Sequence, residues 1–233
     1  MLAIFKREFK SYFQNVIGWL FVAALLAVYG LYFYVYNLKN GYPYISYDLK
    51  GIGFIMMIAV PILTMRSLSD EKKTKTDQLM LTSPVSVGRI VAGKYFAMAA
   101  VYTIVIALFA LSPLVLSIYG KVALSEAYVA LFGYWLYGLS CIAVGLFISS
   151  ISESVIISAI LTFTALFLSY MMQSITGLIS SSGNLLTKVL NCFDLYTPFE
   201  NFVSGCFSVT SAAYYVTVIL LLCFLTTQSI KKR

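Results

Sequence analysis

One stretch of the chain has the spacing of a phosphate-binding loop. Gly88, Gly93 and Lys94 fit the pattern G-x-x-x-x-G-K, in which backbone N–H groups and a lysine hold the phosphates of a nucleotide. The next residue is Tyr95, where the pattern needs a Ser or Thr hydroxyl for magnesium, and no strand precedes the motif. We therefore interpret the match as accidental and Lys94 as an anchor at the inner membrane interface.

The other ionisable residues give no sign of catalysis. Histidine is absent and no Cys-x-x-Cys pair occurs, so neither a zinc nor a haem site is favoured. The nine acidic residues fall at the ends of apolar runs or in loops, whereas ion-driven carriers usually need an ionisable group within the membrane. The sequence thus predicts no catalytic residue, cofactor or metal in this chain and an energy source outside it.

Membrane helices must position these residues. The chain is 61% hydrophobic and 11% charged, with a mean hydropathy of +0.89, which lies outside the range of soluble domains. Because a bilayer core needs about 20 apolar residues in a helix, we predict an all-α membrane protein with one domain, 1–233, and six transmembrane helices. The expected spans are 16–36, 51–65, 93–117, 128–149, 155–175 and 211–228. The second is short unless it begins near Tyr47 or continues through Arg66.

An amphipathic helix is predicted at 1–15. Leu2, Phe5, Phe9 and Phe13 recur at helical spacing, with Lys6 among the polar residues of the other side. The pattern is typical of a helix in the inner headgroup layer. It would serve as a simple anchor or pack beside a cytosolic partner.

Segment 176–210 is predicted to lie outside the cytoplasm and to contain a short outer-leaflet helix before the last span. Thr197 as N-cap, Pro198 at the first helical position and Glu200 three residues after the cap are a helix-start signal, so we interpret Glu200 as a capping residue. Cys192 and Cys206 lie in the same segment. A disulfide between them and two buried free thiols are both open alternatives.

Two prolines and a stripe of small residues bear on helix packing. Pro61 and Pro113 fall inside predicted spans, where each removes a backbone donor and is a candidate hinge. Small side chains recur on one face of span 128–149, which favours close packing within the chain over a dimer seam. They are Gly138, Cys141, Gly145 and Ser149.

The basic residues predict the orientation, because Lys and Arg near span ends are retained on the cytoplasmic side. With six spans, one side receives Lys6, Arg7, Lys10, Arg66, Lys72, Lys73, Lys75, Arg89, Lys94, Lys231, Lys232 and Arg233. The other side receives only Lys39, Lys50, Lys121 and Lys188. We therefore expect a multi-pass protein with both termini in the cytoplasm. Topology and contact with membrane lipid explain the net charge of +7, which gives no ground for a nucleic-acid partner.

The hydrophilic segment 66–78 and its surroundings resemble a known family. Residues 61–86, followed by Gly93, Lys94 and Tyr95, are similar to the signature of type 2 ATP-binding-cassette (ABC) exporter permeases. Residues 199–205, 214–215, 224–226 and 231–233 resemble the last part of the same family. Within it, the chain most resembles the branch of gliding-motility and nitrous-oxide-reductase-maturation permeases.

The resemblance implies a permease of the bacterial cytoplasmic (inner) membrane. Its partners would be a second permease copy or paralogue and two separately encoded ABC ATPase subunits, which bind ATP and magnesium. A further extracytoplasmic subunit is another candidate partner. In the family, the cytoplasmic loop between spans two and three carries a coupling helix that docks on the ATPase, and here this loop is 68–92.

The resemblance and the apolar character of the turn assign the coupling residues. We predict that they are Glu71, Thr76, Leu79, Met80 and Leu81. Two alternatives stay open for the chain as a whole. One is a membrane scaffold or sensor that transports nothing, and the other is a secondary carrier, which the lack of intramembrane charges disfavours.

Overall fold

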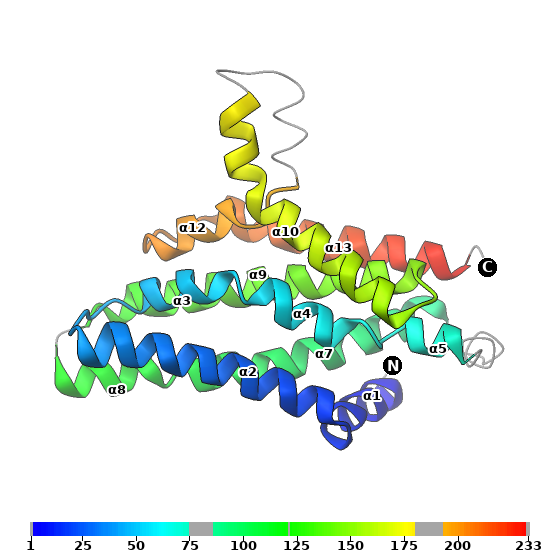
Figure 1. The fold of residues 1–233 in the computed structure, drawn as a ribbon, viewed down its shortest axis with the longest axis horizontal. Coiled ribbons are helices and arrows are strands. Elements are labelled where there is room, and N and C mark those ends of the chain that lie inside the picture. Colours follow the sequence, from blue (N-terminus) through cyan, green and yellow to red (C-terminus); the bar gives the residue numbers. More distant parts are fainter. Residues whose placement is uncertain (1, 75–85, 121, 180–192, 232–233) are drawn as a thin grey trace.

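The computed structural model describes residues 2–74, 86–120, 122–179 and 193–231, without the side chains of Gln173 and residues 175–179. Every regular element in these ranges is helical (Figure 1). Five helices are long and apolar enough to cross a membrane, and a bent pair makes a sixth candidate span. The predicted all-α membrane class with six spans therefore agrees with the architecture.

The helices follow one another in a simple order. The first half contains α1 (Leu2–Gln14), α2 (Val16–Phe33), the π-helical η1 (Tyr34–Lys39), α3 (Ile45–Gly53), α4 (Met56–Thr64) and α5 (Ser69–Lys73). The second half contains α7 (Val87–Phe109), α8 (Ser112–Tyr119), α9 (Leu124–Ile151), α10 (Val155–Ile179), α12 (Thr197–Val203) and α13 (Val209–Lys231). Helix α1 covers the predicted amphipathic segment, while α5 and the first turns of α7 fall within the predicted loop 68–92.

The two ends of the bundle differ in what they carry (Figure 1). Helices α1 and α5 and the C-terminal end of α13 gather at one end, which we call the terminal end. Helices α8 and α12 and the start of α3 lie at the other, which we call the distal end. The late part of α10 points away from the other helices.

Helix α9 is the central helix. In its most apolar 18-residue window 72% of the residues are buried, against 39% or less for the other four long spans. Its glycines permit this burial, because a Cβ on Gly133 would overlap the ring of Phe202, and one on Gly138 would overlap Tyr102 and Met56. The small-residue stripe therefore packs within the chain, as predicted.

The second span was predicted at 51–65, or longer if it begins near Tyr47, and in the structure it is longer and bent. It begins at Ile45, and α3 meets the segment Met56–Lys73, which begins with α4, at an angle of 58°. Short i→i+3 hydrogen bonds form the bend, from Ile55 N to Ile52 O (3.0 Å) and from Met57 N to Phe54 O (3.2 Å). Gly53 lies just before the bend, against the ring of Tyr196.

The two prolines have different surroundings. Pro61 is buried inside α4, which continues across it to Thr64, so the bend of the second span lies before this proline. Pro113 is in the first turn of α8, after a break in the third span. There the Ser112 hydroxyl donates to Phe109 O (2.7 Å), the carbonyl that a residue with an N–H at position 113 would bond. The hinge roles stay predictions.

Helix α12 begins where the sequence predicts, but a different residue caps it. Asp194 Oδ1 accepts hydrogen bonds from Tyr196 N (2.9 Å) and Thr197 N (3.0 Å). Thr197 itself bonds to Asp194 through its hydroxyl. The capping role predicted for Glu200 is therefore wrong: Glu200 Oε1 lies 3.4 Å from Lys50 Nζ and links α12 to α3.

Gly18 lets α1 fold back against the start of α2. A Cβ on Gly18 would lie 2.8 Å from the backbone carbonyl carbon of Tyr12, and a backbone atom cannot rotate away.

We expect Gly18→Ala to cost about 1–3 kcal/mol and to displace α1. Trp19 reports this change, because its indole N–H donates to Phe13 O (2.9 Å), so its fluorescence emission should shift in a Trp135→Phe background. Gly30→Ala, with nothing within 4 Å of the new Cβ, should leave the emission unchanged, and an equal shift in both variants would contradict the assignment.

Candidate coupling site at the terminal end

A buried lysine occupies the centre of the terminal end. The side chain of Lys94 on α7 is only 1% exposed, and its ammonium group has three oxygen partners. It donates to Glu71 Oε1 (2.6 Å), Ser67 O (2.9 Å) and Glu8 Oε1 (3.3 Å). An ammonium group has three N–H donors, so this buried cation is fully satisfied. The prediction of an interfacial anchor is therefore wrong for Lys94.

Two acidic residues from different helices neutralise this lysine. Glu8 comes from α1 and Glu71 from α5, and both are mostly buried. Arg7 adds a second cation at the rim, with Nη2 2.7 Å from Glu8 Oε1 and 3.9 Å from Glu71 Oε1. Two positive and two negative charges thus balance. We call Arg7, Glu8, Glu71 and Lys94 the charge cluster.

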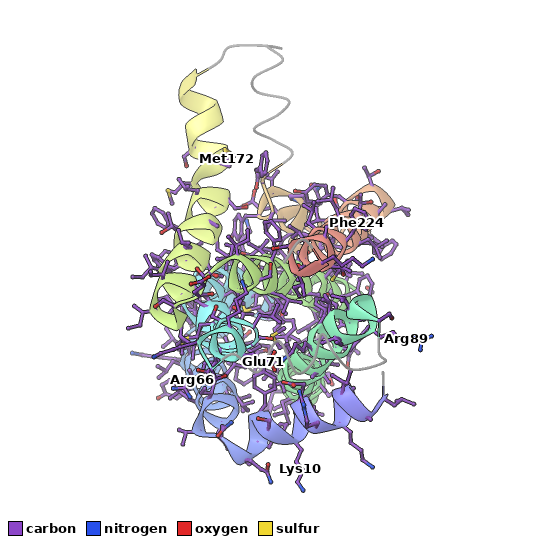
Figure 2. The ribbon with its side chains drawn as sticks, turned by 90° about the vertical axis from the view of Figure 1, so that its right-hand side faces the viewer. Lys10, Arg66, Glu71, Arg89, Met172 and Phe224 are labelled. Carbon is purple, nitrogen blue, oxygen red and sulfur yellow. The ribbon has the colours of Figure 1, made fainter. Side chains whose placement is uncertain are left out.

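Lys94, Glu8 and Glu71 of the charge cluster are mostly buried, unlike Arg7 and the other charges of this end. Figure 2 shows Glu71 among the helices, whereas Lys10, Arg66 and Arg89 lie at the rim. A charge buried in a medium of low dielectric constant costs several kcal/mol unless it is paired and hydrogen-bonded. The cluster therefore holds α1, α5 and α7 in one relative position.

Helix α5 is also fixed to the end of α9. Ser149 Oγ accepts hydrogen bonds from Leu68 N and Ser69 N, both at 3.1 Å, and so satisfies the first N–H groups of a helix with no cap of its own. Ser69 Oγ donates in return to Ser149 O (3.1 Å). Lys72 bonds to the carbonyl of Ser150. Helix α5 therefore connects the charge cluster to the central helix.

Tyr12 closes the α1 side of this region. Burial raises the pKa of the Tyr12 hydroxyl above its usual value, and the nearby carboxylate of Glu8 raises it further. The hydroxyl therefore stays neutral at any physiological pH and adds no charge to the balanced cluster.

The structure places only part of the predicted coupling set. Glu71 is in the charge cluster, while Thr76, Leu79, Met80 and Leu81 lie outside the described residues. Both ends of their segment are placed, because α5 precedes it and α7 follows it. Lys94 and Glu71 thus join the two helices that flank the predicted coupling turn.

Sequence reasoning missed Lys94, Glu8 and Ser149 as members of this site. A signal existed for Glu8, which is the one acidic residue in a basic N-terminal helix. For Lys94, the accidental phosphate-loop match suggested phosphate rather than carboxylate partners. The residues of that match are all helical in α7, and the ammonium group faces carboxylates rather than an open site for phosphate.

A second buried polar pair lies toward the distal end. Asn37 of η1 donates through its amide to Asp48 of α3, and both side chains are buried. Asp48 is in the first turn of α3, at the start of the bent second span, which agrees with the prediction that acidic residues lie at span ends or in loops. Within the described ranges, no group of three His, Cys, Asp or Glu residues is placed to hold a metal ion.

Comparisons with known proteins bear on most of the chain. The family model of the ABC-2 family transporter proteins matches residues 33–227, which include α3 to α12, most of α13, and therefore both helices that flank the predicted coupling turn. The comparison with curated proteins found no match.

Proposed function

Because this chain belongs to the ABC-2 family of transporter proteins, we propose that it is the permease subunit of an exporter that ATPase subunits drive through the segment between α5 and α7. The chain is a multi-pass membrane protein, and its family implies association with an ABC ATPase subunit. The chain itself is the membrane component and not the catalytic one. Export, and this particular route of coupling, are the proposal.

The single observation that carries the proposal is the set of bonds made by Lys94. Its ammonium group joins α5 and α7 at the two ends of the predicted coupling turn and reaches α1 through Glu8. A displacement of that turn would therefore move three helices together. Through Ser149 it would also move the C-terminal end of α9. Rigid-body shifts of connected helices are a common way to change the side from which a transporter is open.

We infer the rest of the assembly from the resemblance and the charge distribution. Two ATPase subunits would bind ATP and magnesium, and a second permease copy or paralogue would complete the membrane part. Both termini would be cytoplasmic in a bacterial inner membrane, since α1 and the start of α7 carry basic residues at the terminal end. A further extracytoplasmic subunit would contact the distal end.

The test is ATP hydrolysis by the ATPase that copurifies with the tagged chain, reconstituted in lipid nanodiscs. We expect the double variant Leu79→Asp, Met80→Asp to lose most of the stimulation, about tenfold, while the protein still inserts. Gln14→Asp with Asn15→Asp is the matched control, because it adds two acids at exposed positions of the same end. Equal stimulation in both double variants would refute the proposed route.

A secondary carrier is the second candidate, because Asp48 is a buried carboxyl in the second span. It predicts solute movement in liposomes that contain the chain alone, driven by an ion gradient and lost in Asp48→Asn. The exporter predicts no movement without the ATPase. A scaffold or sensor predicts ATPase association but no solute movement under either condition.

A further inference from the structure

The distal end contains a pocket that the proposed coupling route does not use. It has a volume of about 270 Å³ and lies where the start of α3, the start of α9 and helix α12 meet. Pockets for drug-sized ligands measure about 300–1,000 Å³, so this one suits a small chemical group. Its charged lining residues are Lys50, Glu126 and Glu200.

The charges of the pocket favour a cation. Lys50 is paired with Glu200 at 3.4 Å, whereas Glu126 has no ion-pair partner among the residues that the structure describes. One ammonium and two carboxylates leave one negative charge. Glu126 is exposed and lies against Gly205: a Cβ there would lie 3.0 Å from Glu126 Cγ, and Gly205 has a φ of +79° that other residues rarely adopt.

Two tyrosine rings complete the lining. Tyr44 and Tyr47 are exposed and meet edge to face, with ring centroids 6.3 Å apart. Both rings line the pocket, and aromatic faces attract ammonium groups within about 6 Å. A carboxylate beside aromatic walls is the combination that recognises an organic ammonium group rather than a hydrated metal ion.

We propose that this pocket binds the ammonium group of a small organic cation. The pocket lies at the end of the spans, where lipid headgroups reside in a membrane. The ammonium group of an ethanolamine or choline headgroup and that of a free small amine share the required chemistry. Glu126 supplies the counter-charge and Tyr47 a wall, while Lys50 neutralises the carboxylate of Glu200 beside the bound group.

The experiment has one arm for each source of the ammonium group. In the first, choline is titrated into the purified full chain in detergent by calorimetry, with 3,3-dimethylbutan-1-ol as its neutral isostere. In the second, native mass spectrometry measures which lipid the chain retains from an equal mixture of phosphatidylcholine and phosphatidylglycerol. Neither arm needs the ATPase, so its result is independent of the proposed coupling route.

Three variants test both the direction and the size of the expected change in binding. Glu126→Gln should weaken choline binding or phosphatidylcholine retention about fivefold, and Tyr47→Leu about threefold. Lys50→Gln should strengthen it about threefold, because it frees the carboxylate of Glu200, whereas a merely structural role of the ion pair would weaken binding. Glu153→Gln, an exposed carboxylate outside the pocket, is the matched control and should change nothing.

The possible outcomes distinguish the two sources of the ammonium group from a refutation of the proposal. Choline binding without lipid preference assigns the pocket to free amines, and phosphatidylcholine retention assigns it to headgroups; both support the proposal if they depend on Glu126. Equal binding of choline and its neutral isostere together with no lipid preference would overturn it. So would binding that Glu126→Gln and Tyr47→Leu leave unchanged.

Discussion

Lys94→Met is expected to lower the apparent melting temperature by about 10 °C. The substitution keeps the length of the side chain but leaves the mostly buried Glu8 and Glu71 with only Arg7 as a cation. Removing one partner of a buried ion pair costs about 3–5 kcal/mol, and for a chain of this size about 2–4 °C accompany each kcal/mol. Intrinsic tryptophan fluorescence during heating, from Trp19 and Trp135, measures the effect.

A second variant separates stability from coupling. Lys94→Met combined with Glu71→Gln removes one charge of each sign and leaves Arg7 with Glu8, so most of the lost stability should return. The bond between α5 and α7 stays absent, and stimulation of the ATPase should remain low. Recovery of both properties together would show that the charge cluster serves stability alone.

The control for Lys94 is a basic residue on the same helix. Arg89 is exposed and lies at the rim rather than among the helices (Figure 2). Arg89→Gln should therefore shift the melting temperature by about 1 °C or less. A shift as large as that of Lys94→Met would mean that general charge at this end, and not the buried ammonium group, determines stability.

Gly145→Ala is expected to force α4 and α9 apart, close to the point where α5 is hydrogen-bonded to α9. The new Cβ would lie 2.8 Å from Thr64 Cβ and 2.9 Å from Thr64 Cγ2. Thr64 is fully buried and its hydroxyl donates to Val60 O (3.0 Å), so its side chain has little freedom to yield. We expect a cost of about 1–3 kcal/mol, measured as a lower melting temperature, and weaker ATPase stimulation because Ser149 lies one turn further along α9.

The compensating change for Gly145→Ala lies on the facing helix. Thr64→Gly removes the atoms that the new Cβ would meet, so the double variant should be more stable than the sum of the two single effects predicts. Contacting residues usually couple by about 0.5–3 kcal/mol. Gly88→Ala on α7 is the control, since its Cβ would make only an ordinary contact of 3.9 Å with Thr227. Strict additivity of the pair would contradict direct packing between α4 and α9.

Several elements could be predicted from local sequence because their causes are local. The long apolar runs determined the helical class and five spans, with the bent pair as a sixth candidate, since only a helix satisfies its own backbone in a membrane. The amphipathic repeat predicted a helix at 1–15, which α1 fills. The small-residue stripe of span 128–149 predicted close packing in the chain, and α9 is the buried centre of the bundle.

The capping of α12 and the bend of the second span could not be predicted from local sequence, because they depend on competing groups and on residues from other helices. Thr197 and Glu200 offered a good local cap, but Asp194 competes for the same N–H groups and Lys50 attracts Glu200 from another helix. The bend between α3 and α4 is formed at Phe54, before Pro61, and the neighbours that Gly51 and Gly53 approach lie far along the chain, at Tyr32 and Tyr196.

What the sequence by itself determined is that this chain spans a membrane as a helical permease domain with a hydrophilic segment between its second and third spans. Only the tertiary structure decided which charges of that region work together. The oxygens that satisfy Lys94 come from residues 23, 27 and 86 positions away, and the value of a charge depends on partners and burial that no local pattern encodes. A lysine at the membrane boundary and a lysine buried between two carboxylates therefore look alike until the helices are packed.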